Sequence, residues 1–130
     1  MKQTFSKEER LCSRRLISQL FAKGHTFYVK PFRVTWLQQP PESDSLVQVL
    51  MSVPKYNFRK AVHRNLLRRR MKEAYRLNKQ FLHDSLAGTG IQLVFCITYT
   101  AKEIMDYDLI QAKIILLLQR LTESDEKVTG

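Results

Sequence analysis

The sequence KAVHRNLLRRRMKEAYR, residues 60–76, decides how this chain folds. Its apolar residues recur at helical spacing, which predicts an amphipathic helix from about residue 60 to about residue 82. On a helical projection the expected core side carries Val62, Leu66, Leu67, Ala74, Leu77 and Phe81. The other side is cationic or polar and carries Arg64, Asn65, Arg68, Arg69, Lys72, Arg76 and Lys79. Arg70 falls on the apolar side, and we expect it to snorkel or to reach a partner elsewhere.

The positive charge of the chain is concentrated in and around this helix. The 130 residues include 22 Lys and Arg against 12 Asp and Glu, a formal net charge of +10, and residues 55–76 hold nine basic residues and one acid, Glu73. Like charges four residues apart repel on a helix, so an ordinary solvated face intersperses acids with its bases. The imbalance favours a polyanionic partner, with nucleic acid first. An anionic membrane surface is the second candidate, but the apolar side that it would need is expected in the core.

The spacing of these cations suits a phosphate backbone. Arg64, Arg68, Lys72 and Arg76 recur every fourth residue, about 6 Å apart along a helix axis. Guanidinium groups stay charged and bind phosphate oxygens in pairs. The helix is therefore predicted to bind nucleic acid through this side.

Upstream of the basic helix, the sequence predicts a helix followed by a hairpin. Ser6 with Glu9 forms a possible capping box, Ser13 is an alternative start, and Gly24 offers a left-handed stop. In residues 27–38 aromatic and β-branched side chains recur at every second position, which predicts a half-buried strand. Turn residues 39–45 follow, so residues 46–53 are expected to be the antiparallel partner strand.

Downstream, the sequence predicts a central strand and a closing helix. Residues 91–99 are almost continuously apolar, and residues 106–121 carry a broad apolar stripe that Thr100 or Asp106 could cap. The tail 122–130 is polar and is expected to fray. The order α-β-β-α-β-α predicts an α/β (α+β) two-layer sandwich with three or four strands, formed as a single domain by residues 1–121. Cys12 and Cys96 are expected to be reduced, buried thiols, since they lack zinc-site spacing.

The stretch 60–76 also resembles the protein subunit of bacterial ribonuclease P. The family signature A-V-x-R-N-x-x-[KR]-R-x-x-[KR]-E matches residues 61–73, and the similarity extends over nearly the whole chain. The resemblance implies a left-handed crossover around the basic helix. It also implies that a large catalytic RNA with bound Mg²⁺ performs the chemistry, while the protein joins that RNA and helps to recognise the 5′ leader of precursor tRNA. The sequence departs from common family residues at Ile17, Arg59, Leu66 and Arg70.

Two sets of site residues follow from the motif and the basic side of the helix. The set expected to contact the catalytic RNA is Lys60, Arg64, Asn65, Arg68, Arg69, Lys72 and Arg76. The set that the resemblance places near the single-stranded leader is Ile17, Phe21, Phe32, Arg33 and Thr35. Phe21 and Phe32 could stack on bases or belong to the core, and the core is the commoner place for aromatics at such spacing.

No catalytic residue and no protein-bound metal is expected. The acids are scattered, and His25, His63 and His83 fall in unrelated elements, so the protein alone is not expected to cleave RNA. We expect a cytoplasmic chain, monomeric in its complex, whose partners are the catalytic RNA and precursor tRNA and not a membrane. Two alternatives stay open: a structural rRNA-binding or ribosome-associated protein, and a DNA-binding regulator, for which Asn65 is weak support.

Overall fold

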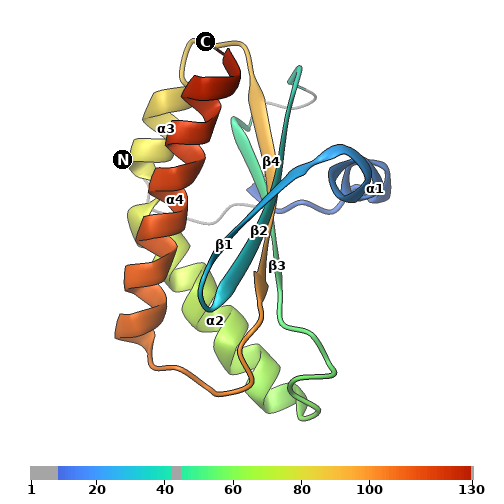
Figure 1. Ribbon diagram of the computed structural model, residues 1–130, viewed down its shortest axis with the longest axis vertical. Coiled ribbons are helices and arrows are strands. Elements are labelled where there is room, and N and C mark those ends of the chain that lie inside the picture. The colour runs from blue at the N-terminus through green and yellow to red at the C-terminus, as the bar shows by residue number, and fades with distance from the viewer. Residues whose placement is uncertain (1–8, 42–44, 130) are drawn as a thin grey trace.

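A four-stranded sheet separates the helices into two groups (Figure 1). The computed structural model describes residues 9–41 and 45–129, with side chains as far as Glu123. Its elements are α1 (Arg14–Lys23), β1 (His25–Val29), β2 (Phe32–Gln39), β3 (Val47–Ser52), α2 (Ala61–Asn78), α3 (Gln80–Leu86), β4 (Gln92–Tyr99) and α4 (Tyr107–Thr129). Helices α2, α3 and α4 cover one face, while α1 lies against the other. The predicted α+β class is confirmed, with α1 as an addition to the two main layers.

The predicted pairing of residues 27–38 with residues 46–53 is wrong. The sheet order is β1-β2-β4-β3, so β4 separates the two segments, and β3 is parallel to β4. All eight residues of β4 are buried, which explains why this most apolar strand takes a central place with a neighbour on each side. The antiparallel hairpin is instead β1 with β2, divided by a turn at Lys30-Pro31 within the predicted single strand. The left-handed crossover through α2 and α3 stays a prediction.

The buried side of α2 differs from the predicted one by about a quarter of a turn. Leu67, Met71, Ala74 and Tyr75 are buried, because α2 packs against both β3 and α4. The predicted core residues Val62, Leu77 and Phe81 are exposed instead. Arg70 does reach a partner elsewhere, since its guanidinium donates to the carbonyl oxygen of Met105 before α4.

The predicted helix 60–82 is interrupted at Lys79, where α2 ends and α3 begins. Lys79 was expected on the cationic side, but it is only 6% exposed and its Nζ pairs with the carboxylate of Glu9. The Tyr75 hydroxyl donates to Glu9 at 3.5 Å and lies 3.3 Å from His83 Nε2. Burial raises the pKa of Tyr75 and lowers the pKa of His83, so both groups favour their neutral forms around this ion pair. The cluster fastens the N-terminal segment onto α2 and α3.

Helix α1 begins at the second of its two predicted starts. The Ser13 hydroxyl accepts a hydrogen bond from the Leu16 N–H, whereas Ser6 lies outside the described residues. Gly24 ends α1, but its φ of −72° is not left-handed, so that part of the prediction is wrong. A Cβ at this position would collide with the Leu20 carbonyl oxygen and lie 2.9 Å from that of Trp36. Gly24 is therefore required by close packing of α1 on β2.

Replacing Gly24 with Ala should destabilise the fold by about 1–3 kcal/mol, because two backbone oxygens would have to move. Urea unfolding of the purified protein measures this change. The control is Ala22→Ser at an exposed position of α1, which should stay within about 0.5 kcal/mol of the parent. Equal stability of both variants would show that the close approach of α1 to β2 is not required.

The closing helix has the predicted cap. The Asp106 carboxylate accepts a hydrogen bond from the Leu109 N–H at 2.9 Å, whereas the Thr100 hydroxyl donates to the Pro31 carbonyl oxygen at 2.9 Å. The helix continues past Leu121 to Thr129. Its apolar stripe buries Ile110, Ile114, Leu117, Leu118 and Leu121 in the main core.

Candidate nucleic-acid interface

Exposed cations lie on α2 and on the loop that precedes it. Lys55, Arg59, Lys60, Arg69 and Lys72 are all exposed, and no carboxylate of the described residues lies within ion-pairing distance of them. We refer to these five side chains as the basic surface. The nearest acid in the sequence, Glu73, is already paired with Arg76, whose guanidinium lowers the pKa of that carboxyl group by hydrogen bonding. The basic surface thus keeps its full positive charge for a partner.

The four cations predicted to follow a phosphate backbone are Arg64, Arg68, Lys72 and Arg76, and we refer to them as the ladder. The ladder is only partly available for phosphate binding. Arg64 turns back onto the chain, and its Nη1 donates to the carbonyl oxygens of Phe58 at 2.8 Å and Arg59 at 2.9 Å. Arg76 holds Glu73 in an i,i+3 pair. Arg68, the second step of the ladder, donates to the Asn65 side-chain oxygen and is half-buried. The ladder therefore combines fixed arginines that shape the surface with Lys72, whose ammonium group is exposed.

A groove of about 180 Å³ runs beside this ladder. It is lined by Arg10, Leu11, Cys12, Val49, Leu50, Met51, Arg68 and Lys72. Its wall forms because the Leu11 N–H donates to the Val49 carbonyl oxygen at 3.0 Å, which lays the N-terminal segment along the edge of β3. The combination of an apolar floor and basic side chains suits a nucleotide, with its phosphate at the cations. Both cysteines are free, but Cys12 is exposed here, contrary to expectation, while Cys96 is buried.

The sheet face opposite α2 and α4 carries a second set of polar and aromatic side chains. Cross-strand pairing aligns Tyr28, Arg33, Thr98 and Ser52 across the four strands. Tyr28 is 64% exposed, and Phe21 of α1 is 54% exposed. We refer to this region as the open face. This side of the sheet thus carries two exposed aromatic rings, on β1 and α1, and the half-buried guanidinium of Arg33, the kinds of side chain that hold an unpaired nucleic-acid strand.

The predicted leader residues are distributed over both faces of the sheet. Phe32 is 1% exposed and packs edge-on against Tyr99 in the main core, so it does not belong to the open face. Alternation along β2 is the reason, since Phe32 and Arg33 must point to opposite faces. Thr35 is buried beside the Thr26 hydroxyl at 3.4 Å, and Ile17 of α1 is half-buried against the smaller core cluster. Of the predicted set, Phe21 is exposed and Arg33 is half-buried.

Sequence reasoning missed Tyr28 and Ser52 of the open face, and the buried Thr98 that aligns with them. Tyr28 could have been found from the sequence by recognising the turn at Lys30-Pro31, because the register then places Tyr28 opposite Arg33. Thr98 and Ser52 depend on the order of β2, β4 and β3, which local pattern does not contain.

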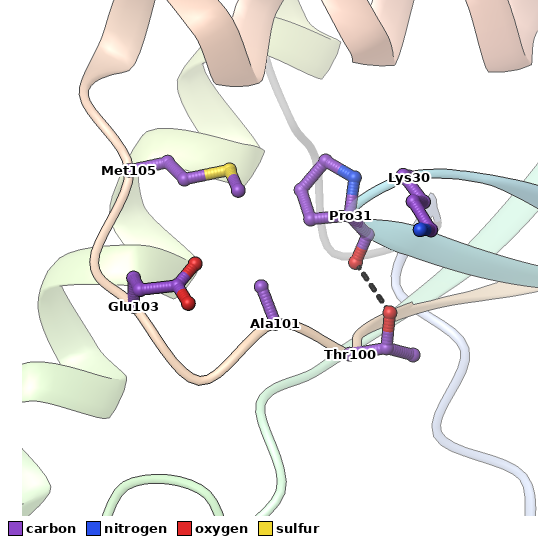
Figure 2. Close-up of a pocket in the computed structure, with 6 residues that line it drawn as sticks. All are labelled: Lys30, Pro31, Thr100, Ala101, Glu103 and Met105. Atoms are coloured by element: carbon purple, nitrogen blue, oxygen red, sulfur yellow. Dashed lines mark hydrogen bonds between the residues drawn. The ribbon is translucent and has the colours of Figure 1, made fainter.

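Another hollow, of about 270 Å³, lies at the β1–β2 turn (Figure 2). It is lined by Lys30, Pro31, Thr100, Ala101, Glu103 and Met105. Figure 2 shows the Glu103 carboxylate beside the hollow, so its one lining cation, Lys30, is accompanied by one acid. This hollow therefore does not extend the basic surface.

Comparison with known proteins identifies the family of the chain. The family model described as Ribonuclease P matches residues 5–122. The chain belongs to the ribonuclease P protein family. The ribonuclease P protein component of Porphyromonas gingivalis is 37% identical over 102 residues, which cover 78% of this chain and 74% of the relative. That of Chlorobium phaeobacteroides is 30% identical over 129 residues, covering 92% of this chain and 88% of the relative.

Solved structures of the family share the fold. The RNase P protein from Thermotoga maritima has a TM-score of 0.67 at 24% identity, covering 86% of this chain and 96% of that one. A Staphylococcus aureus RNase P protein mutant has a TM-score of 0.69 at 20% identity, covering 88% and 89% of the two chains. Family membership supports the role of a subunit of the RNA-based tRNA-processing enzyme over the ribosomal and DNA-binding alternatives. Among the described helices, none has the length and apolar character to cross a membrane.

Proposed function

We propose that this protein is the RNA-binding, non-catalytic subunit of a ribonuclease P. In this proposal its basic surface binds the catalytic RNA, and its open face binds the 5′ leader of precursor tRNA while the RNA cleaves the leader from the tRNA. The observation that carries the proposal is the set of five exposed cations around α2 without a described carboxylate partner. Such a surface gains most from a polyanion, whose bound counterions are released on contact.

We propose further that Mg²⁺ is held mainly by the RNA. The described residues contain no cluster of three or more His, Cys, Asp or Glu side chains that could hold a metal ion. Three of their acids have other partners: Glu9 pairs with Lys79, Glu73 pairs with Arg76, and Asp106 caps α4. These donors do not form the carboxylate cluster that a protein-bound Mg²⁺ would need.

The open face suits the leader because the leader is single-stranded. Unpaired bases can stack on aromatic rings without regard to sequence, and a nearby guanidinium can bind the backbone. Phe21 and Tyr28 supply exposed rings, and Arg33 supplies the charge between β1 and β4. Residues of the small core cluster, including Leu16 and Leu20, hold α1 in place beside this face. The expected monomeric state and cytoplasmic location stay predictions.

Removing one exposed ring from the open face should weaken binding of leader-bearing precursor tRNA and spare mature tRNA. Phe21→Ala and Tyr28→Ala should each lower precursor affinity of the protein–RNA complex about 5- to 100-fold, because each stacked base contributes about 1–3 kcal/mol. Equilibrium binding with labelled precursor and mature tRNA measures the effect. Leu109→Ala, at an exposed apolar site on α4, is the matched control. Equal losses for both tRNA forms would contradict leader binding at this face.

A further inference from the structure

The loop between β3 and α2 presents an aromatic ring that neither the open face nor the groove uses. Tyr56 is 78% exposed, more than any other large apolar side chain among the described residues. In Figure 1 this loop extends past the end of the sheet, at the beginning of α2. A ring placed so far into solvent adds nothing to the core, so its position calls for another explanation.

The loop is held firmly on both sides of Tyr56. A turn is closed by the Asn57 N–H, which donates to the Pro54 carbonyl oxygen at 3.3 Å. After the turn, Phe58 is buried with its ring centre 5.8 Å from that of Tyr99. The two hydrogen bonds from Arg64 fix the next backbone carbonyls. The ring of Tyr56 is thus presented from an ordered turn, which lowers the entropy lost when it binds.

The surroundings of Tyr56 are cationic. Lys55, Arg59 and Lys60 are exposed on the same loop, and the sequence has no acid between Asp44 and Glu73. A flat ring among cations matches an unpaired nucleotide, whose base stacks on the ring while its phosphates meet the charges. An acid-poor loop with a single exposed aromatic offers little to a hydrophobic protein partner.

We propose that Tyr56 is a stacking platform for an unpaired base of the RNA in the ribonuclease P complex. This inference rests on the proposed function, since it requires that the basic surface contacts RNA. The base could come from the catalytic RNA or from the precursor tRNA, and both supply the same chemistry. Arg64 acts as a positioning residue here, because it holds the turn through Phe58 and Arg59.

The test measures affinity for the catalytic RNA alone and for precursor tRNA in the assembled complex. Tyr56→Ala should weaken at least one of these about 5- to 100-fold, while Tyr56→Phe should bind like the parent because it keeps the ring. Tyr56→Leu keeps apolar bulk without the ring and should lose affinity like Tyr56→Ala. Ile104→Ala, at an exposed apolar position on another loop, should change neither affinity.

The pattern of losses identifies the source of the base. If Tyr56→Ala lowers the affinity for the isolated catalytic RNA, the base belongs to that RNA. If it lowers only the affinity of the assembled complex for precursor tRNA, the base belongs to the substrate. The slope of log affinity against log salt should stay at the parental value, because Tyr56 carries no charge to replace a counterion. Parental binding of Tyr56→Ala to both RNAs, or equal binding by the Leu and Phe variants, would overturn the inference. The proposed function would still stand if replacing Arg69 and Lys72 weakened binding of the catalytic RNA.

Discussion

Replacing Arg69 and Lys72 together with Ala should weaken binding of the catalytic RNA about 100-fold or more at moderate salt. Each side chain is exposed and has no described carboxylate partner, so no acid competes with a phosphate group for either cation. A hydrogen bond to a charged group contributes about 1.5–3 kcal/mol, and 1.4 kcal/mol corresponds to a tenfold change in affinity. The slope of log affinity against log salt should become shallower by about 0.7–0.9 for each phosphate that the variant no longer binds.

The control for this prediction removes the same charge elsewhere. Lys23→Ala with Lys102→Ala takes away two exposed cations distant in sequence from α2. This pair should leave the affinity for the catalytic RNA close to the parental value and the salt slope nearly unchanged. If both double variants lost affinity equally, net charge would explain binding, and the basic surface would have no special role.

Replacing Lys79 with Met should destabilise the fold by about 3–5 kcal/mol, because it removes the ammonium group that pairs with the buried Glu9 carboxylate. Burial already disfavours charge in this cluster, as the lowered pKa of His83 and the raised pKa of Tyr75 indicate. Urea unfolding at neutral pH measures the loss. Adding Glu9→Gln to Lys79→Met should recover part of the stability, since the variant then no longer buries the carboxylate charge.

The control for the buried pair is Lys72→Met, which removes a lysine from an exposed position of α2, the helix that ends just before Lys79. It should shift the unfolding free energy by about 0.5 kcal/mol or less. Similar stabilities of Lys79→Met and Lys72→Met would contradict a structural role for the contact between Glu9 and Lys79.

The basic helix could be predicted from sequence because charge and helical spacing are local properties. Residues 60–76 show nearly all their cations on one arc, and the structure leaves five cations of residues 55–72 exposed. The predicted core side was only partly right. Leu67 and Ala74 are buried as predicted, but the buried arc continues into Met71 and Tyr75, which the helical projection did not include. Only the packing of α2 between β3 and α4 fixes which part of a broad apolar arc is buried.

The sheet order and the buried ion pair could not be predicted from local pattern. Whether residues 46–53 pair with β2 or β4 depends on a connection through two helices, which carries no local signal. Lys79 looks like any solvated lysine until Glu9, seventy residues earlier, packs against it. The open face was partly predicted through Arg33 and Phe21, whereas the prediction for Phe32 was wrong because neighbouring residues of a strand point to opposite faces.

The most direct measurement of the central claim is cleavage of labelled precursor tRNA by a bacterial ribonuclease P RNA at low Mg²⁺, with and without this protein. We predict that the protein restores release of the leader at the mature 5′ end, that the protein without RNA cleaves nothing, and that the Arg69→Ala, Lys72→Ala variant restores much less activity at the same protein concentration. Cleavage by the protein alone would contradict its role as a non-catalytic subunit. Full activity of the double variant at limiting protein would contradict binding of the RNA by the basic surface.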